Sequence, residues 1–476
     1  MTEETLDIPL SLVSKLSANH AWHYRVLVKS FLNNSIELYA SESDAMQGKV
    51  EELELILGTN LKLDLVSEDL ISNSLLKFYK RESIDSRVTN LEYTGSQEEF
   101  LQRLISEAKA LKSSDIHIET YENNCRIRLR IDGQLVERFR VEKSDYPSVI
   151  NKIKIMSNLD ISEKRLPQDG RIFFATAKDK FDIRVSILPT LHGEKVVLRL
   201  LNNDATEIDL FKLGFSKIDL SNYLEAINRP NGILLISGPT GSGKTTTLYA
   251  TLKLLNKSSR NITTIEDPIE YTLDGVNQVQ LKENIGFTFP AALRNFLRQD
   301  PNIIMVGEIR DTETANMAIR ASLTGHLVLS TIHTNSAWGT VARLIDMGIP
   351  PFLVADTLNT SIAQRLVRAL CPFCKKEEVF DSRLYPKQFI PALSIDRHFV
   401  AVGCNQCFQT GYSGRKAVYE VIPIDHELSD QIKANNYRVY DILKDRGIKT
   451  LAENAFELFF NGETTIDEIF ALLYNS

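Results

Sequence analysis

Residues 238–245 read Gly238-Pro239-Thr240-Gly241-Ser242-Gly243-Lys244-Thr245, a complete phosphate-binding loop pattern. An apolar run at 233–236 precedes it, and a helix-forming stretch that continues through 248–250 follows it. The three glycines let the backbone curl so that successive N–H groups point at phosphate oxygens, and the helix adds the positive end of its dipole. This order of strand, loop and helix predicts that the chain binds a nucleoside triphosphate, although the pattern alone names no reaction.

Two side chains of the loop have specific predicted roles. Lys244 is expected to place its ammonium group against the β- and γ-phosphates, and the Thr245 hydroxyl is expected to ligate Mg²⁺. The cofactors predicted here are therefore ATP and Mg²⁺. The predicted nucleotide-binding residues are Gly238, Pro239, Thr240, Gly241, Ser242, Gly243, Lys244, Thr245 and Thr246.

The composition is that of a soluble globular protein. The chain has 476 residues, enough for two to four domains, with 43% hydrophobic and 25% charged residues. Its apolar runs are shorter than the roughly 20 residues that a membrane span needs. The acidic start at residues 1–7 lacks the features of a secretory signal, so a cytoplasmic location is expected. The net charge of −7 argues against broad attraction to nucleic acid.

The first half of the chain shows several patterns of secondary structure. Residues 1–80 are predicted to form a small α/β or helical docking domain, and the polar stretch 85–97 a linker. Apolar residues at spacings of three and four predict a helix over 99–111. Alternating apolar and polar residues at 115–119 and 126–131, before an Asp-Gly turn, predict a hairpin with one dry face.

Two groups of basic residues in this half could have a function. Arg126, Arg128 and Arg130 are interpreted as a solvated face of the hairpin, with an acidic neighbour in an oligomer as the alternative. Residues 165–171 are predicted to form a tight charged turn that begins and ends in arginine, before strands at 172–174 and 181–185. Rigidly held guanidinium groups could deliver charge to a phosphate, and surface ion pairs are the alternative.

Acidic residues follow two buried strands of the second half. The strand 262–265 ends in Glu266, and the strand 303–306 runs through Gly307 into Glu308. Because parallel strands end at one edge of a sheet, both carboxylates are expected beside the phosphates. Glu308 is the candidate base that polarises the attacking water, and Glu266 is a candidate for completing the Mg²⁺ shell with Thr245.

A third buried strand at 327–332 has a histidine at each end, His326 and His333. One end of this strand must face the nucleotide. An imidazole there could sense the γ-phosphate by hydrogen bonding, and structural caps of the strand are the alternative.

Four of the five cysteines form two Cys-x-x-Cys pairs, separated by residues 375–403. In a reducing compartment, four thiolates from two such turns fill the tetrahedral shell of Zn²⁺ and leave no open position for water. A structural zinc site is therefore predicted, with unrelated thiol pairs or a redox dithiol as alternatives. The predicted ligands are Cys371, Cys374, Cys404 and Cys407.

Taken together, these segments resemble the secretion ATPase superfamily of type II secretion and type IV pilus systems. The resemblance covers roughly residues 95–476. It extends backward through 165–171 and 192–194, and forward to Gly414-Arg415. Besides the phosphate loop, its main segments are Thr264-Ile265-Glu266-Asp267-Pro268-Ile269-Glu270-Tyr271, Leu297-Arg298-Gln299-Asp300-Pro301, Gly307-Glu308-Ile309-Arg310-Asp311, and Thr324-Gly325-His326 through His333-Thr334.

The resemblance implies a multidomain α/β fold and assigns roles to residues. A small N-terminal domain with its linker is expected at 1–90, and a PAS-like α/β domain at 91–205. A RecA-like P-loop ATPase domain is expected at 206–476, with the zinc-binding insertion at about 368–412. The catalytic residues that the family's boxes imply are Lys244, Glu266, Glu308, His326 and His333, together with Arg171 and Arg184 of the preceding domain, which would reach the γ-phosphate.

Family members form hexameric rings that hydrolyse ATP and pass mechanical work to an inner-membrane platform protein. The resemblance therefore implies a cytoplasmic homo-hexamer at the inner-membrane face, attached to the membrane through its partners. Assembly and secretion members typically carry the four-cysteine element, whereas pilus retraction motors lack it, which favours assembly or export here. The sequence does not separate pilus assembly from type II secretion.

Two other functions are alternatives to this one. A nucleic-acid translocase or helicase would use a similar loop, but the negative charge and the lack of an evident basic aromatic stripe argue against nucleic-acid binding. A nucleotide-gated scaffold would bind ATP without turnover, and Glu308 and the arginines argue against it.

Overall fold

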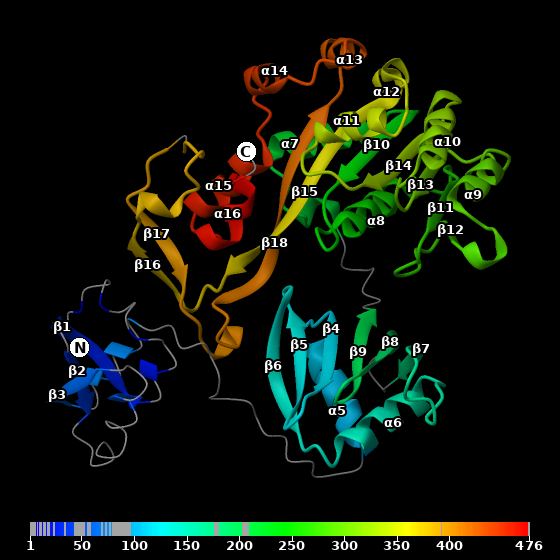
Figure 1. Cartoon of the computed structure of the whole chain (residues 1–476). Coiled ribbons are helices and arrows are strands. Elements are labelled where there is room, and N and C mark those ends of the chain that lie inside the picture. Colours follow the sequence, from blue (N-terminus) through cyan, green and yellow to red (C-terminus); the bar gives the residue numbers. More distant parts are fainter. Residues whose placement is uncertain are drawn as a thin grey trace. The chain divides into compact units, whose positions relative to one another are not determined.

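The computed structural model describes residues 97–175, 180–201, 209–391 and 393–474, together with separate parts of residues 6–78. The chain divides into two compact units, Met1–Val88 and Thr89–Ser476 (Figure 1). The linker expected at 85–97 lies outside the described residues, except for Gln97, which begins a helix. None of the helices in these described parts is long and apolar enough to cross a membrane.

The first unit contains a three-stranded sheet in the order β1-β2-β3. β1 and β2 pair antiparallel, and β2 and β3 pair parallel. Helical residues such as Ile71 and Leu75 are buried in the same core as Leu38 of β2. Of the two predictions for this region, the α/β fold is the one observed. The strands are β1 (Val26–Leu32), β2 (Ser35–Ser41) and β3 (Asn60–Val66).

The second unit begins with a domain built on a six-stranded antiparallel sheet in the order β6-β5-β4-β9-β8-β7. Two helices share one hydrophobic core with the sheet, because the apolar positions of the strands alternate and those of the helices recur every three or four residues. The elements are α5 (Gln97–Ala110), β4 (Asp115–Thr120), β5 (Cys125–Ile131), β6 (Gln134–Val141), α6 (Tyr146–Met156), β7 (Gln168–Ala175), β8 (Lys180–Thr190) and β9 (Gly193–Leu201).

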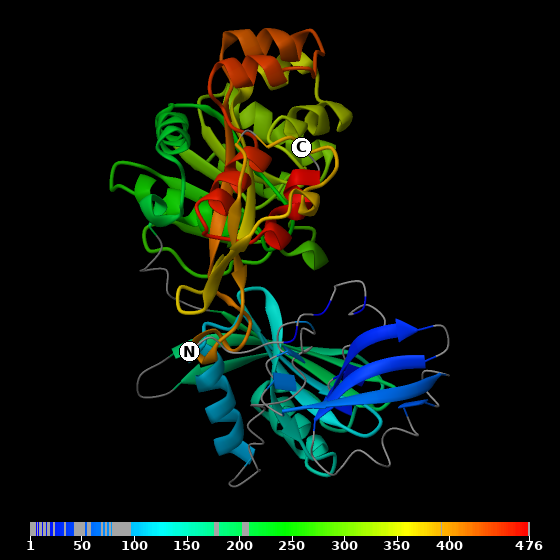
Figure 2. The same ribbon diagram turned by 90° about the vertical axis from the view of Figure 1, so that its left-hand side faces the viewer.

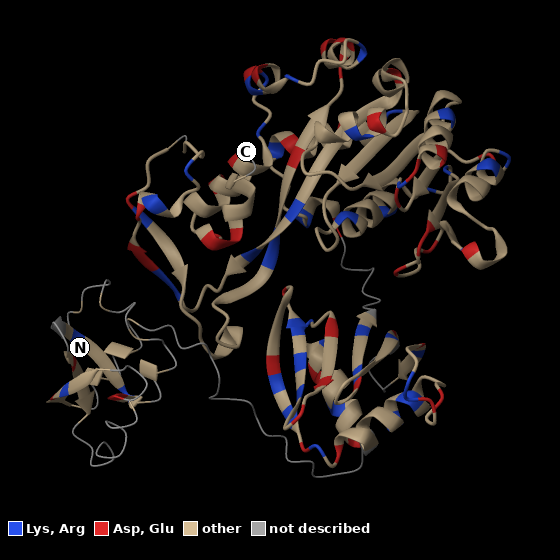
Figure 3. Ribbon diagram, viewed as in Figure 1, with Lys and Arg blue, Asp and Glu red and all other residues tan. Residues whose placement is uncertain are grey.

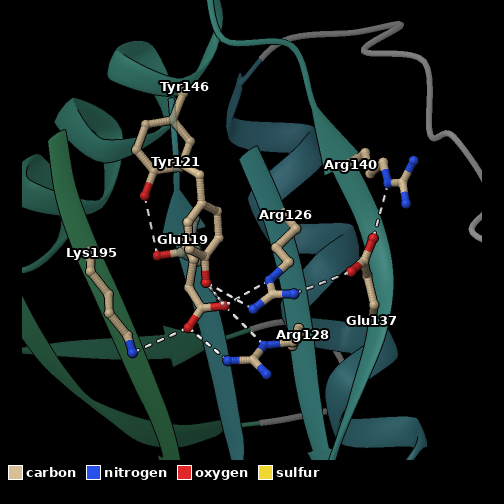
Figure 4. A network of polar contacts seen from close by, with 9 residues as sticks. Glu119, Tyr121, Arg126, Arg128, Glu137, Arg140, Tyr146 and Lys195 are labelled. Carbon is tan, nitrogen blue, oxygen red and sulfur yellow. Dashed lines mark hydrogen bonds and ion pairs between the residues drawn. The ribbon is translucent and has the colours of Figure 1, made fainter. Parts of the chain in front are cut away.

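The arginines of β5 correct one prediction. They were expected to be a solvated face, but Arg126 and Arg128 converge on Glu119 of β4, whose side chain is only 4% exposed. Arg126 Nε lies 3.1 Å and Arg128 Nη2 2.8 Å from this carboxylate, and Lys195 of β9 lies 3.1 Å from it (Figure 4). Arg130 pairs with Asp115 at 3.4 Å. The expectation was wrong because an alternating pattern does not reveal which charges the neighbouring strands supply.

The Glu119 cluster makes a testable contribution to stability. Burial alone would raise the pKa of the Glu119 carboxyl, but hydrogen bonds from Arg128, Lys195 and Arg126 outweigh it and lower the pKa from 4.5 to about 2. Replacing Glu119 with glutamine leaves cations facing each other, and breaking a buried pair costs about 3–5 kcal/mol. Because these cations keep part of their surface in water, we expect a loss of about 2–3 kcal/mol at pH 7.

The pH dependence of this effect has a defined sign. The folded-state pKa lies below the ordinary value, so the stabilisation is present above about pH 4.5 and disappears as the pH falls toward 2. Urea unfolding of wild type and Glu119→Gln should therefore differ at pH 7 and differ less at pH 3.5. Glu122→Gln, at an exposed neighbouring carboxylate, is the control. A difference between wild type and Glu119→Gln that does not change with pH would contradict the role of this charge.

The charged segment 165–171 is also partly different from its prediction. β7 already begins at Gln168, so the second half of the expected turn is strand. Arg171 on this strand donates from Nε to Asp182 of the neighbouring strand β8 at 2.8 Å. In the register of the two strands, Arg171 itself lies opposite Arg184. The segment ends in a paired arginine on a sheet rather than in a free turn.

The rest of the second unit is built on a seven-stranded sheet in the order β12-β11-β13-β14-β10-β15-β18. All strands run parallel except β18, which pairs antiparallel with β15. β10, β11, β13 and β14 are fully buried, as near-continuous apolar runs predict for a parallel sheet covered on both faces. The strands are β10 (Gly232–Ser237), β11 (Ile262–Glu266), β12 (Asn277–Gln280), β13 (Ile303–Val306), β14 (Leu327–Ile332), β15 (Leu358–Leu370) and β18 (Tyr412–Pro423).

Helices cover both faces of this sheet, and their residues divide between two hydrophobic cores. β15 and β18 are long, and the insertion between them lies at the opposite end of this pair from α13 and α14 (Figures 1 and 2). The insertion carries β16 (Lys375–Val379) and β17 (Arg397–Ala401). The helices are α7 (Lys217–Asn228), α8 (Lys244–Leu255), α9 (Phe289–Phe296), α10 (Thr312–Leu323), α11 (Gly339–Asp346), α12 (Pro351–Thr357), α13 (His426–Lys433), α14 (Tyr440–Asp445), α15 (Leu451–Phe460) and α16 (Ile466–Tyr474), with short 3₁₀ turns at Leu210–Lys212, Glu283–Ile285, Ser382–Leu384 and Asn405–Cys407.

Candidate functional site

The site lies where the central parallel strands end. β10 pairs with β14 through Ser237↔Ile332, and β11 pairs with β13 through Ile265↔Val306. The residues that follow these strands therefore meet at one edge of the sheet, which is where open parallel sheets bind their ligands. The phosphate loop, Glu266, Glu308 and His333 all lie at this edge.

The phosphate loop needs glycine at two of its positions for space as well as for conformation. Gly238 has φ 150° and Gly243 has φ 86°, both in the region that favours glycine. A Cβ at Gly238 would lie 2.5 Å from the carbonyl oxygen of Gln364, and one at Gly243 would lie 2.8 Å from that residue's side-chain nitrogen. β15 thus supports the loop from behind and leaves no room for a side chain.

Lys244 is folded back onto its own loop. Its ammonium donates to the carbonyl oxygens of Gly238 at 2.7 Å and Pro239 at 3.0 Å, and the residue is only 9% exposed. Burial lowers the pKa of this ammonium and Arg365 adds to the effect, whereas the carboxylate of Glu308 opposes it. The negative charge near this ammonium therefore does not offset the effect of its burial.

The loop fits a bound polyphosphate. The first turn of α8 leaves the N–H groups of Lys244, Thr245 and Thr246 without partners inside the helix, as at every helix start. The Ser242 hydroxyl is buried and has no hydrogen-bond partner among the described residues. The Thr245 side chain is exposed. An anion at this helix start would satisfy these donors, and the Thr245 hydroxyl is accessible to a hydrated Mg²⁺.

Glu308 follows β13 after Gly307, and its side chain is 16% exposed. Its two oxygens contact different partners. Arg310 donates to Oε1 at 2.5 Å, and the Nε2 atom of His333 lies 3.4 Å from Oε2. This carboxylate is held by Arg310, has His333 beside it, and keeps some access to solvent. Its charge also acts on the ammonium of Lys244.

Glu266 has a different environment, since it is 4% exposed at the end of β11. Thr264 donates to its Oε1 at 2.5 Å, Gln278 donates to the same oxygen at 3.1 Å, and the phenol of Tyr249 on α8 donates to Oε2. Tyr249, which sequence reasoning missed, therefore links the helix of the phosphate loop to this carboxylate. Glu266 is fixed by hydrogen bonds, whereas Glu308 faces the open edge.

The structure brings only one of the two predicted histidines to this edge. His326 precedes β14 and lies at the opposite end of the strand, where its carbonyl oxygen accepts from the N–H of Gly232 at the start of β10. Its Nδ1 atom lies 2.8 Å from the carbonyl oxygen of Ala321. A strand of this length separates the two histidines by about 20 Å. Within one chain, His326 is therefore a structural cap, the alternative that the sequence had left open.

The arginines of the preceding domain are placed as follows. Arg184 on β8 donates to the carbonyl oxygen of Ile269 at 3.1 Å and lies 3.8 Å from Glu270, in the segment that follows Glu266. Arg171 is 67% exposed and pairs with Asp182. Neither of the two contacts the phosphate loop in any described interaction within the chain.

The four cysteines of the insertion assemble into one cluster. Their Sγ atoms all lie within 4.8 Å of one another. The Sγ–Sγ distances Cys371–Cys404, Cys374–Cys407 and Cys404–Cys407 are 3.9, 3.7 and 3.7 Å. A tetrahedron with Zn–S bonds of about 2.3 Å has edges of about 3.8 Å. The N–H groups of Cys404 and Gly411 each donate to the sulfur of Cys407 at 3.2 Å. The cluster is compatible with a tetrahedral zinc ion.

Sequence reasoning also missed Gln364, Arg365 and Glu420 on β15 and β18. Gln364 accepts from Thr247 of α8 at 2.9 Å, and Arg365 donates to the carbonyl oxygen of Asn335 at 2.9 Å. Their signal in the sequence was a charged or polar residue inside an otherwise apolar strand, as in Val418-Tyr419-Glu420-Val421-Ile422. Such a residue needs a buried partner, but the sequence does not name that partner.

Comparisons with known proteins agree with this geometry. The family described as "Type II/IV secretion system protein" matches residues 90–471. The chain is 42% identical over 449 residues to the "Type IV pilus assembly ATPase PilB" of Myxococcus xanthus, covering 88% of this chain and 79% of that one. It is 40% identical over 453 residues to "Type II secretion system protein E" of Pseudomonas aeruginosa, covering 88% and 89%.

A solved structure shares the fold. The pilus retraction motor PilT with bound ADP superposes with a TM-score of 0.53 at 26% identity, covering 78% of this chain and 96% of that one. The match of the family over most of the chain and the extent of these identities leave one assignment: the chain belongs to the type II/IV secretion system protein family, and it is an ATPase.

Proposed function

We propose that this chain is a cytoplasmic motor ATPase that works as a homo-hexamer at the inner-membrane face and powers type IV pilus assembly or type II protein secretion. Its similarity to a pilus assembly ATPase and to a type II secretion protein E supports both pathways about equally. Force would pass to an inner-membrane platform protein, and no nucleic acid takes part. The observation that carries the proposal is the meeting of Lys244, Glu308 and His333 at one sheet edge.

In this proposal the phosphate loop binds ATP. The amides at the start of α8 and the Ser242 hydroxyl hold phosphate oxygens, and Lys244 exchanges its two loop carbonyls for the β- and γ-phosphates. Mg²⁺ would be held by Thr245, with Glu266 in its outer shell, and would neutralise the phosphate charge. Tyr249 and Thr264 keep the Glu266 carboxylate fixed for that contact.

Glu308 acts as the general base in this site. Its position after β13 lets it accept a proton from the attacking water, while the neighbouring His333 senses the γ-phosphate. Arg310 donates to one oxygen of Glu308 at 2.5 Å, which helps to hold the carboxylate at this edge of the sheet. His326 is left out of the catalytic set because of its place at the far end of β14.

The preceding domain supplies further positive charge to the ATP site. We assign Arg171 and Arg184 to the stabilisation of the γ-phosphate, since Arg171 is exposed and Arg184 reaches the segment after Glu266 of its own chain. The domains in this proposal are an N-terminal docking domain with its linker at 1–90, a PAS-like α/β domain at 91–205 and a RecA-like ATPase domain at 206–476. The four cysteines bind a structural Zn²⁺ that closes the insertion at about 368–412.

A turnover assay tests the proposal at Lys244. A charged hydrogen bond contributes about 1.5–3 kcal/mol, so Lys244→Ala should lower kcat/KM for ATP by about 10- to 150-fold. Lys257→Ala, at an exposed lysine just beyond α8, is the control and should retain wild-type turnover. Equal phosphate release by wild type and Lys244→Ala would refute the assignment of the phosphate loop.

The same assay separates the alternatives when it is run with single-stranded DNA and with phospholipid vesicles. Stimulation of turnover by DNA alone would favour a nucleic-acid translocase over the secretion motor. ATP binding without phosphate release under any of these conditions would favour a nucleotide-gated scaffold.

A further inference from the structure

Glu420 on β18 is a buried carboxylate that connects two distant segments of the ATPase domain. It is 6% exposed. Its Oε1 atom accepts from the backbone N–H of Ala337 at 3.3 Å, and its Oε2 atom accepts from the backbone N–H of Leu451 at 3.2 Å. Ala337 lies in the loop after β14, and Leu451 is the first residue of α15. One side chain therefore holds both segments.

The loop that Glu420 contacts begins with a residue of the ATP site. This His333 loop, residues 333–338, follows β14 directly. Its carbonyl oxygens are held from two strands: Ser237 of β10 donates to Ser336 at 3.4 Å, and Ser361 of β15 donates to Ala337 at 2.7 Å. Glu420 supplies an acceptor for an N–H of the same loop. Hydrogen bonds therefore fix the loop at the carbonyl oxygens of Ser336 and Ala337 and at the N–H of Ala337.

Burial disfavours the charge of Glu420, and its hydrogen-bond partners favour it. Burial raises the pKa of its carboxyl to about 7, against the N–H groups of Leu451 and Ala337 and the nearby Arg365, which lower it. The amino-terminal end of α15 also favours an anion. A buried carboxylate without acceptable partners would be costly, and here each oxygen has a backbone donor.

We propose that Glu420 is a positioning residue for ATP hydrolysis: by joining Ala337 to the first turn of α15, it holds the His333 loop so that the His333 imidazole stays beside Glu308. The proposal rests on the proposed roles of Glu308 and His333. Glu420 touches neither nucleotide nor water in this role. It couples the position of the loop to that of the C-terminal helix α15. In this way it maintains the 3.4 Å distance between His333 Nε2 and Glu308 Oε2.

The test compares Glu420→Gln and Glu420→Ala with a variant that weakens the same helix start without touching the loop. Thr450 caps α15, because its hydroxyl accepts from the N–H of Glu453 at 3.2 Å, and its own N–H donates to Glu453 at 2.8 Å. Thr450→Ala removes this side-chain cap and leaves Ala337 bonded to Glu420. It is therefore the matched control for a loss of stability alone.

Steady-state ATP hydrolysis and thermal unfolding of the full chain give the readouts. Glu420→Gln should lower kcat about tenfold, since displacements of about 1 Å in a catalytic site can have effects of this size or larger. KM for ATP should change less than about twofold, because the phosphate loop keeps its contacts. Glu420→Ala should lower kcat further, since glutamine still offers one acceptor oxygen and alanine offers none. Thr450→Ala should keep wild-type kcat.

Two results would overturn the inference. One is wild-type kcat in both Glu420 variants. The other is a fall in kcat that Thr450→Ala reproduces at the same loss of melting temperature, which would mean that Glu420 acts through stability alone. If Glu420→Ala does not fold, Glu420→Gln decides the question. Absence of turnover in the wild-type chain, or equal turnover in Lys244→Ala, would instead refute the proposed function.

Discussion

Replacement of Glu308 with glutamine is expected to lower kcat for ATP hydrolysis about 100- to 10,000-fold, the usual contribution of a general base. Glutamine preserves the shape of the side chain and can still accept from Arg310, but it cannot take a proton from water. KM for ATP should change little, because the loop donors around Lys244 are untouched. Single-turnover phosphate release measures the chemical step directly, and equilibrium nucleotide binding shows that the site still fills.

The matched control is Glu313→Gln on α10, an exposed carboxylate that pairs with Arg294 at 3.0 Å. It should hydrolyse ATP at the wild-type rate. A Glu308→Gln chain with the rate constant of the wild type would remove Glu308 from the catalytic set. Glu266 would then be the next carboxylate to test, although its hydrogen bonds to Tyr249 and Thr264 make it less free to take a proton.

Loss of the cysteine cluster is the second change with a large expected effect. A structural zinc site contributes apparent binding free energies of about 10–16 kcal/mol to the segment that it closes. Part of the insertion packs against α15, where the ring centroids of Phe380 and Phe459 and of Phe389 and Phe456 lie 5.6 and 5.5 Å apart. By contrast, β16 is exposed along its whole length, and Phe373 between the first two cysteines faces solvent. Cys404→Ser with Cys407→Ser should abolish bound zinc and leave β16 and the two Cys-x-x-Cys turns open to protease.

Zinc content by atomic spectroscopy and limited proteolysis check this outcome. Cys125→Ser is the control, because Cys125 is buried in the preceding domain and its thiol donates to Thr120 at 3.2 Å, a bond that serine can keep. It should retain one zinc per chain. Full zinc content in the double variant, together with an uncleaved insertion, would refute the metal site. The parallel sheet should survive in either case, because the buried residues of its two cores lie outside residues 371–411, from which only partly buried side chains such as Phe380 pack against them.

The distribution of charge over the second unit shows how far a local pattern can mislead. Basic residues follow the strands of the 97–201 domain, but acidic residues lie among them on the neighbouring strands (Figure 3). The alternation at Arg126, Arg128 and Arg130 established correctly that these side chains share one face of β5. It did not establish what they face. Their partners, Glu119 and Asp115, come from another strand through antiparallel register.

The sequence by itself determined the elements whose cause is local. The glycines and Lys244 specify the phosphate loop, near-continuous apolar runs specify the buried strands β13 and β14 within their observed bounds, and two Cys-x-x-Cys pairs specify one cluster. In each case the residues that form the feature are close together in the chain, or their side chains, such as thiolates, bind only a few kinds of partner. These are the features that short-range spacing can encode.

The tertiary structure alone decided which end of a strand faces the site and which buried charge meets which donor. His326 and His333 are equivalent in the sequence, and only the parallel pairing of β14 with β10 places one beside Glu308 and the other at the far edge. Glu420 likewise acquires a role because β18 folds back between the His333 loop and α15. The physical reason is that strand order and register bring together groups far apart in the chain, and no local pattern carries that information.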